Sequence, residues 1–242
     1  MIKAEVIILA GGLATRLKNL TKKKPKSLID INGKPFIERQ LDLLKDQGIK
    51  KVIISIGHYG EQIKKYLKKN YKKKIKIKFV KDTPFLLGTG GAIVNSSKFL
   101  KKNFFVIYGD SYLRFNLKTM RNFYLRKKPK ILMAIYKNNK KLDKSNLQIN
   151  KKGYVYYNKR NVKENMKYID YGVSIINLSI LKNLKKKKYY DLGDIFTYYS
   201  LRNDIMGMVV KNRFFEIGSK KGINDTRKYF KNLKKKNEKF HN

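Results

Sequence analysis

The sequence predicts an α/β fold, a three-layer, Rossmann-like domain with a mostly parallel mixed sheet and a small antiparallel extension. In the first half of the chain, short apolar runs alternate with segments whose apolar residues recur at helical spacing, which is the βαβ order of a parallel sheet. In the second half, strand-like runs follow one another with turn residues between them, which is typical of antiparallel pairing. Hydrophobic residues make up 42% of the 242 residues, which is enough for a proper core.

The first half predicts strands and helices in strict alternation. Residues 5–9 (EVIIL) form an apolar, β-branched run that ends in two glycines, as a buried strand does. Residues 35–47 begin with proline and stop before Gly48, which are helix start and stop signals. The other elements expected here are strands over 52–56, 75–80 and 104–108 and helices over 61–67 and 90–100. In open sheets of this kind ligands bind beyond the carboxyl ends of the strands, so the residues after each strand are the candidate site.

The second half predicts the antiparallel extension and the last helices. Its expected elements are strands over 131–136, 169–176, 206–210 and 214–217, a hairpin over 147–157 that turns near Gly153, and helices over 191–201 and 220–233. No repeat or linker divides the chain. We therefore expect one domain over 1–233 and a basic, frayed tail over 234–242.

The formal charge of +42 suggests a partner that is a polyanion, such as RNA or DNA. Three observations favour a lysine-rich surface without a specific nucleic-acid partner. Lysine far outnumbers arginine, the lysines are spread along the whole chain, and asparagine and isoleucine are abundant as well. Recognition of base edges and phosphates favours arginine.

Other features of the composition exclude whole classes of protein. The absence of cysteine excludes a disulfide framework and thiolate metal sites. The start of the chain has no signal-peptide pattern, and no apolar run reaches the roughly 20 residues that a membrane helix needs. We therefore expect a cytoplasmic protein with no membrane insertion.

The loop after the first strand, residues 9–16 (LAGGLATR), has the composition of a phosphate-binding loop. The loop starts at Leu9, and its glycines Gly11 and Gly12 let backbone N–H groups approach an anion closely. Thr15 adds a hydroxyl donor, and Arg16 adds a planar cation. The loop is neither a P-loop nor a dinucleotide-binding fingerprint, because its glycine spacing fits neither motif.

Four more motifs follow this loop in order: PKSLI (25–29), LGTGGAI (87–93), YGD (108–110) and FFEIG (214–218). Together they resemble the signature of the sugar-1-phosphate nucleotidyltransferases, over most of the chain. The arrangement is similar to the heptose-1-phosphate guanylyltransferase, muramate-phosphate uridylyltransferase and mannose-1-phosphate guanylyltransferase types. The resemblance implies a nucleotide-binding half over about 1–115 and a sugar-phosphate-binding half over about 116–233.

The resemblance also assigns roles to charged residues. It implies that Arg16 and Lys26 are catalytic cations, and that Lys26 reaches the attacked phosphate. Nucleotidyl transfer brings two polyanions together, so such cations offset their repulsion. Asp110, which is also assigned to catalysis, and Glu216 would be the ligands of a Mg²⁺ ion, although the family often has Asp where Glu216 stands. No general base is required, because a sugar phosphate is already anionic.

The remaining assignments concern the two substrates. By resemblance, Gly11, Gly12, Thr15 and Arg16 hold the triphosphate, and Leu9 also belongs to the nucleotide-binding residues. Gly88, Thr89 and Gly90 lie against the base and ribose. On the sugar side, Lys159 is a candidate for the 1-phosphate, although it is equally well explained as a solvated lysine, and Gly172 belongs to the strand that lines the sugar pocket.

The expected reaction joins an NTP to a sugar 1-phosphate, with Mg²⁺, and releases an NDP-sugar and pyrophosphate for surface-glycan or cell-wall synthesis. Two alternatives remain open. One is a cytidylyltransferase that acts on a non-sugar phosphate such as phosphocholine. The other is a non-catalytic protein that binds a nucleotide or a nucleic acid. The sequence predicts neither the base of the NTP, nor the acceptor, nor the oligomeric state.

Overall fold

The computed structural model of the 242-residue chain describes residues 5–13, 17, 20–72, 75–82, 85–138 and 142–239, with side chains up to residue 234. Among these residues the central sheet has nine strands, and seven of them lie in the order β10-β6-β9-β4-β1-β2-β3. The seven strands are β1 (Glu5–Ala10), β2 (Lys51–Ile56), β3 (Lys76–Lys81), β4 (Asn103–Tyr108), β6 (Ile131–Lys137), β9 (Tyr168–Asn177) and β10 (Ile205–Val210).

The sheet is mixed, as the sequence predicts. Strand β1 pairs in parallel with β2 and β4, β2 pairs in parallel with β3, and β6 pairs in parallel with β10. Strand β9 runs antiparallel to both β4 and β6 and so joins the two parallel groups. The hairpin of β7 (Leu147–Ile149) and β8 (Val155–Tyr157) extends from β9. The predicted α/β class with an antiparallel extension is confirmed.

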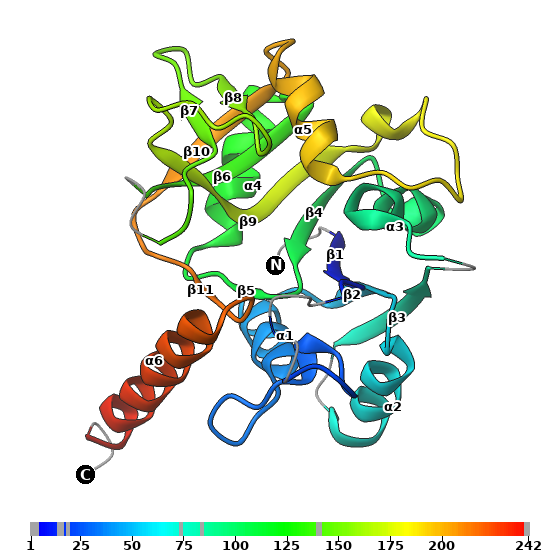
Figure 1. The fold of residues 1–242 in the computed structure, drawn as a ribbon, viewed down its shortest axis with the longest axis vertical. Helices are drawn as coiled ribbons and strands as arrows, with labels where there is room; N and C mark the ends of the chain where they lie inside the picture. Colours follow the sequence, from blue (N-terminus) through cyan, green and yellow to red (C-terminus); the bar gives the residue numbers. More distant parts are fainter. Residues whose placement is uncertain are drawn as a thin grey trace.

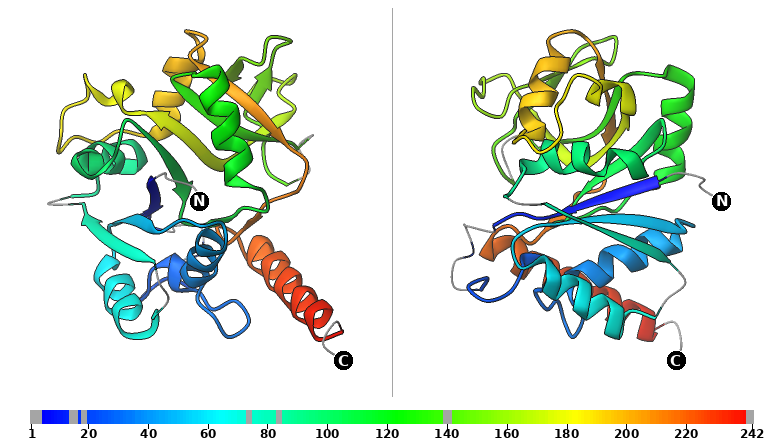
Figure 2. Two further views of the ribbon diagram at one scale, coloured as in Figure 1. Left: turned by 180° about the vertical axis from the view of Figure 1, so that it is seen from behind. Right: turned by 90° about the vertical axis from the view of Figure 1, so that its right-hand side faces the viewer.

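Helices cover both faces of the sheet (Figures 1 and 2). They are α1 (Phe36–Asp46), α2 (Gly60–Asn70), α3 (Gly88–Ser96), α4 (Leu117–Lys127), α5 (Leu192–Ser200) and α6 (Lys220–Lys239), with short 3₁₀ helices η2 (Lys26–Leu28), η3 (Ser97–Phe99) and η4 (Leu178–Leu181). Alternate side chains of β1 enter opposite faces, because successive residues of a strand point to opposite sides. Val6 and Ile8 pack with α1, α2 and α4, whereas Ile7 and Leu9 pack with α3 and α5.

A third cluster of apolar residues holds the end of the chain to the first half. Phe215, Ile223 and Phe230 are buried with Ile31 and Phe36. The two-residue strand β11 (Phe215–Glu216) pairs antiparallel with β5 (Ser111–Tyr112), in a small sheet separate from the central one. Beyond this cluster α6 extends away from the rest of the molecule toward the C-terminus (Figure 1).

The structure differs from the sequence prediction in a few elements. Helix α4 was not predicted, although Leu117, Met120 and Tyr124 recur at helical spacing and are all buried. Its start is capped by the Asn116 side chain, which accepts hydrogen bonds from two backbone N–H groups of the first turn. Helix α3 begins at Gly88 rather than at residue 90. Helix α6 continues to Lys239 rather than ending at 233, because no proline or glycine interrupts residues 234–239.

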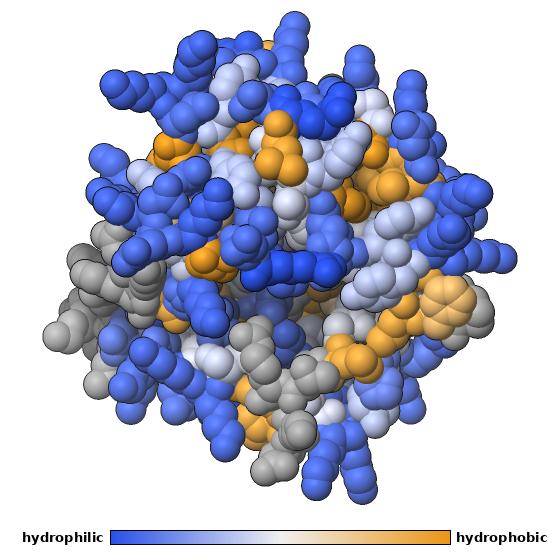
Figure 3. Space-filling model, turned by 45° about the horizontal axis from the view of Figure 1, so that its top comes forward, coloured by the Kyte–Doolittle hydropathy of each residue, from blue (hydrophilic) through white to orange (hydrophobic). Residues whose placement is uncertain are grey.

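The surface reflects the composition. The face drawn in Figure 3 is mostly hydrophilic, with apolar side chains in small, separated patches. In the part of the chain that the structure describes, no helix combines the length and the apolar character needed to cross a bilayer.

Candidate functional site

The loop after β1 lies at the carboxyl edge of the parallel strands, tight against its neighbours. The backbone carbonyl of Leu9 accepts a hydrogen bond from the N–H of Gly109, at 3.0 Å. A Cβ atom on Gly57, which follows β2, would lie 2.6 Å from the carbonyl oxygen of Gly11. A Cβ on Gly12 would meet no atom of the described residues within 4 Å. One side of the loop is therefore packed against the next strand, and its other side is open at Gly12.

Lys26 and Asp110 come together at this edge, although 84 residues separate them. Lys26 Nζ donates to Asp110 Oδ2 at 2.6 Å, and the two side chains are 19% and 26% exposed. Lys26 starts helix η2, which is anchored by the buried residues Pro25 and Ile29 on either side. Asp110 follows β4 in the turn that leads into β5. The structure thus pairs the predicted catalytic lysine with the predicted carboxylate in a partly buried ion pair.

Glu216 reaches the same region through its backbone, because it pairs in register with Ser111 and the Ile217 N–H donates to the carbonyl of Asp110 at 3.0 Å. Its side chain turns toward the start of α6. The carboxylate accepts hydrogen bonds from the N–H groups of Gly218 and Ser219 and from the Ser219 hydroxyl. It lies directly over Gly222, where a Cβ atom would overlap it. Glu216 thus holds the Gly218–Ser219 segment just before α6, and Ser219 caps the helix by accepting from the N–H of Gly222 at 2.9 Å.

The glycine-rich segment at the start of α3 is covered by a segment from the second half of the chain. The N–H groups of Gly90 and Gly91 donate to the carbonyl of Tyr190, at 2.8 and 3.2 Å. The Thr89 hydroxyl accepts from the N–H of Leu192 at 2.9 Å. Gly88 has a φ of +71°, and a Cβ there would lie 2.6 Å from the Tyr190 carbonyl oxygen. Close packing against this segment therefore accounts for glycines that the sequence assigns to nucleotide binding, and that assignment stays a prediction.

Asp170 lies where β9 approaches the same edge. Its carboxylate accepts from the Tyr108 hydroxyl at 2.9 Å and from the N–H of Gly172 at 2.8 Å. Burial raises the pKa of Asp170 to about 6, although these hydrogen bonds and the charge of Lys159 oppose the shift. Gly172 has a φ of +90°, and a Cβ there would lie 2.8 Å from the Ser111 hydroxyl. Gly172 thus lets β9 lie directly against the residue that follows Asp110.

Lys159 lies beyond Asp170, in an exposed position. Its Nζ atom is 3.3 Å from Asp191 Oδ2, and its side chain is 61% exposed. Asp191 caps helix α5 by accepting from the N–H of Gly193. The neighbouring Arg160 pairs with Asp194 at 2.6 Å. The structure places Lys159 beside the first turn of α5, and its predicted role with the sugar phosphate stays a prediction.

Asp82 is an acid that the sequence prediction missed. It directly follows β3, so the rule that singled out Asp110 would have found it. Asp82 is 8% exposed, and its Oδ1 atom has no hydrogen-bond partner among the described residues, while Oδ2 accepts from the N–H of Leu87 over 3.5 Å. Burial raises the pKa of Asp82 to about 6.

The acidic side chains near Asp110 bear on whether this edge of the sheet can bind a metal ion. Among the residues that the structure describes, no group of three or more His, Cys, Asp or Glu side chains could hold a metal ion. Mg²⁺ commonly uses one or two carboxylates and takes its other ligands from water and substrate phosphates. Asp110 supplies one such carboxylate, with Ser111 Oγ 3.4 Å from its Oδ1 atom. The residues present therefore fit a Mg²⁺ ion that arrives with a phosphate substrate.

Two predicted residues, Thr15 and Arg16, lie outside the described residues. Of the others, the structure brings together Leu9, Gly11, Lys26, Asp110 and the backbone of Glu216. The start of α3 and Lys159 are linked to each other through the first turn of α5, by the Thr89–Leu192 hydrogen bond and the Lys159–Asp191 ion pair.

The chain belongs to the nucleotidyl transferase family, because residues 5–147 match the family model described as Nucleotidyl transferase. It is 30% identical over 218 residues to the D-glycero-alpha-D-manno-heptose 1-phosphate guanylyltransferase of Aneurinibacillus thermoaerophilus, an alignment that covers 88% of this chain and 93% of that protein. The corresponding enzyme of Campylobacter jejuni is 43% identical over 118 residues, which cover 48% of this chain and 52% of that protein. These findings confirm the family predicted from the motifs.

A second kind of relative matches over a shorter segment. The choline-phosphate cytidylyltransferase of Streptococcus pneumoniae is 48% identical over 67 residues, which cover 28% of this chain and 29% of that protein. The chain thus spans about half or less of the length of these two bacterial relatives, from Campylobacter and Streptococcus.

The fold is also that of solved relatives. The crystal structure of HddC from Yersinia pseudotuberculosis has a TM-score of 0.79 and 27% identity, and the match covers 94% of this chain and 99% of that one. The same protein complexed with GMP-PN has a TM-score of 0.79 and 26% identity, with the same coverage.

Proposed function

We propose that this chain transfers a nucleotidyl group from an NTP to a sugar 1-phosphate and releases pyrophosphate and an NDP-sugar. The observation that carries the proposal is the Lys26–Asp110 pair, 2.6 Å apart at the carboxyl edge of the sheet, beside the glycine loop after β1. Membership of the nucleotidyl transferase family supports it. So do the guanylyltransferase relatives, whose names specify a heptose 1-phosphate.

The chemistry needs positive charge more than it needs a base. An oxygen of the sugar phosphate is the nucleophile, and it is already anionic at neutral pH. It forms a bond to the α-phosphorus of the NTP while the bond from that phosphorus to the bridging oxygen of pyrophosphate breaks. Lys26 can exchange its bond to Asp110 for a phosphate oxygen and so stabilise the charge that spreads over the transferred group. The open side of the β1 loop at Gly12 offers backbone N–H groups for the departing phosphates.

Magnesium is the second part of the proposal. Asp110 would hold the ion together with substrate phosphates, and a bound Mg²⁺ would neutralise phosphate charge and orient the triphosphate. Glu216 would become a second ligand only if its carboxylate left the start of α6, to which three hydrogen bonds now hold it. The proposed product would serve surface-glycan or cell-wall synthesis.

A second candidate is a cytidylyltransferase that acts on a non-sugar phosphate. The 48% identity over 67 residues to a choline-phosphate cytidylyltransferase favours it. The Lys26–Asp110 pair serves both reactions, because each joins a phosphate to the α-phosphorus of an NTP. The two candidates differ in base and acceptor and therefore separate in a substrate panel.

The test is pyrophosphate release by the full chain with ATP, CTP, GTP, UTP and dTTP. Each is combined with heptose 1-phosphate, mannose 1-phosphate, glucose 1-phosphate, N-acetylmuramate 1-phosphate or phosphocholine, with Mg²⁺ or with EDTA. We expect one pair with a sugar 1-phosphate to react far faster than the rest, and EDTA to stop the reaction. A preference for CTP with phosphocholine would support the second candidate. No release with any pair would refute both.

A matched variant separates the site from a general loss of charge. Lys130 pairs with Asp204 at 3.0 Å, at the amino ends of β6 and β10 and thus away from the carboxyl edge. Lys130→Met should leave turnover unchanged, whereas Lys26→Met should lower it. Equal losses in both variants would show that the Lys26 contact has no special role.

A further inference from the structure

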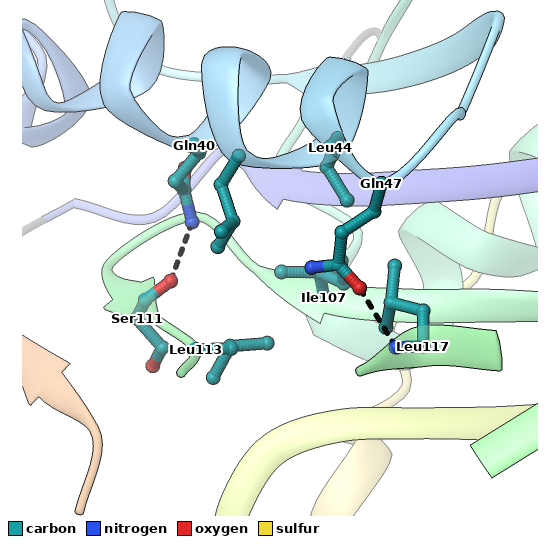
Figure 4. Close-up of a pocket in the computed structure, with 8 residues that line it drawn as sticks. Gln40, Leu44, Gln47, Ile107, Ser111, Leu113 and Leu117 are labelled. Atoms are coloured by element: carbon teal, nitrogen blue, oxygen red, sulfur yellow. Dashed lines mark hydrogen bonds between the residues drawn. The ribbon is translucent and has the colours of Figure 1, made fainter. Parts of the chain in front are cut away.

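A buried side chain of α1, Gln40, forms hydrogen bonds with the backbone of the turn that carries Asp110. Gln40 is 3% exposed, and its Nε2 atom donates to the carbonyl of Tyr108 at 2.9 Å and to the carbonyl of Ser111 at 2.8 Å. These carbonyls stand on either side of the Gly109–Asp110 pair. Figure 4 shows the amide nitrogen directed from the helix toward Ser111.

The orientation of this amide is fixed by its partners. Both backbone groups are acceptors, so only the NH₂ end of the side chain can satisfy them. The other end, Oε1, is buried and has no hydrogen-bond partner among the residues that the structure describes. Gln40 lines a small cavity whose other lining side chains are mostly apolar, among them Leu44, Ile107 and Leu117 (Figure 4). An amide oxygen left unpaired in such a place costs stability, and a buried group of this kind needs an explanation other than packing.

Two more backbone groups of the turn are held by hydrogen bonds. The N–H of Gly109 donates to Leu9 at the end of β1, and the carbonyl of Asp110 accepts from Ile217 beside β11. Gln40 adds the only side-chain amide that bridges the turn among the described residues. The turn is thus held by groups from β1, α1 and the segment after β11. Its one charged side chain, Asp110, is directed at Lys26.

From this geometry we infer that Gln40 is a positioning residue for the proposed nucleotidyl transfer, which holds the Asp110 carboxylate opposite Lys26 by bridging the carbonyls of Tyr108 and Ser111. The expected effect of Gln40 on turnover rests on the proposed function, whereas its hydrogen bonds to the turn do not. Gln40 itself lies on the core side of the turn and touches neither charge. Its effect on turnover therefore comes through the position of Asp110.

The test compares Gln40→Met with Gln47→Met. Gln47 lies two turns further along the same face and lines the same cavity, and its Oε1 atom accepts from the N–H of Leu117 at 2.7 Å, away from Asp110. We expect Gln40→Met to lower kcat by about 10- to 100-fold with KM values within about threefold, because small displacements of a reacting constellation carry such losses. Gln47→Met should keep kcat within about threefold. Equal kcat values for the two variants would overturn the inference.

The pH dependence of kcat in Gln40→Glu distinguishes the bridging role from a purely structural role of Gln40. An ionised glutamate presents only acceptors to the two carbonyls, whereas the protonated form regains one donor. The kcat of Gln40→Glu relative to the wild type should therefore rise as the pH falls from 8.5 to 6. A ratio that stays constant over this range would contradict the bridging role.

Amide hydrogen exchange tests the same claim without any substrate. In Gln40→Met, the N–H groups of Gly109 and Ile217 should exchange at least about tenfold faster, while those of the central strands and of Gln47→Met stay unchanged. Unchanged exchange at both amides would overturn the inference even if the enzyme is active. If no substrate pair releases pyrophosphate, the proposed function fails while the exchange result still decides whether Gln40 holds the turn.

Discussion

Asp82 gives the prediction with the best-defined magnitude. The residue is 8% exposed, one carboxylate oxygen has no hydrogen-bond partner in the part of the chain that the structure describes, and burial raises its pKa from 3.8 to about 6. A carboxyl group with a raised pKa binds its proton more tightly in the folded state than in the unfolded state. The free energy of unfolding therefore falls as the pH rises from the unfolded pKa of 3.8 through the folded pKa of about 6, and the loss of stability is complete above pH 6.

The size of the effect follows from the shift. A shift of roughly two pKa units corresponds to about 3 kcal/mol of lost stability at pH 8, and to only about 0.5 kcal/mol at pH 4. Asp82→Asn removes this pH-dependent contribution, whatever constant difference the amide introduces. We therefore expect the difference in free energy of unfolding, variant minus wild type, to be about 2–3 kcal/mol larger at pH 8 than at pH 4, so that the variant gains stability relative to the wild type as the pH rises.

The assay is urea denaturation of both proteins between pH 4 and pH 8.5, followed by circular dichroism, with the m-value checked for constancy. The exposed Asp143 provides the control, because Asp143→Asn should change the free energy of unfolding by about 0.5 kcal/mol or less at every pH. A difference between Asp82→Asn and the wild type that is the same at pH 4 and pH 8 would refute the reasoning. So would a variant that gains stability only at acid pH.

Three further predictions concern the site. Asp110→Asn should abolish pyrophosphate release with an unchanged circular dichroism spectrum; wild-type turnover would show that the metal assignment is wrong. Lys26→Met should lower kcat by about 10²–10³, as the loss of other charge-stabilising groups does, and a loss below tenfold would contradict its role. Gly222→Ala should lower the free energy of unfolding by about 1–2 kcal/mol, because the new methyl group displaces the Glu216 carboxylate from its place over the start of α6. Thermal unfolding measures this change. Helix propensity alone predicts that the variant is more stable by about 1 kcal/mol, and that result would contradict the expectation.

The sequence alone determined the fold class and the family. The apolar run over 5–9 and its glycines predicted a buried strand, because strand and turn signals of this kind depend on neighbouring residues only. Pro25–Lys26 and Tyr108–Asp110 were recognised from local motifs in the right order. The strand-end rule placed Asp110 at the carboxyl edge of the sheet, the family resemblance assigned Lys26 to the attacked phosphate, and the structure pairs the two at 2.6 Å.

Only the tertiary structure decided what each of these side chains contacts. Glu216 matched a metal-binding motif, and its carboxylate accepts hydrogen bonds from Gly218 and Ser219 in the segment that joins β11 to α6. The glycines at 88–91 matched a nucleotide loop, yet residues 188–190, a hundred positions away, pack against them. Gln40 is one more polar residue on an amphipathic helix in the sequence, and its two backbone partners lie about 70 residues further along. Sequence patterns report the period and the identity of neighbouring residues, whereas these contacts depend on how distant segments pack against one another.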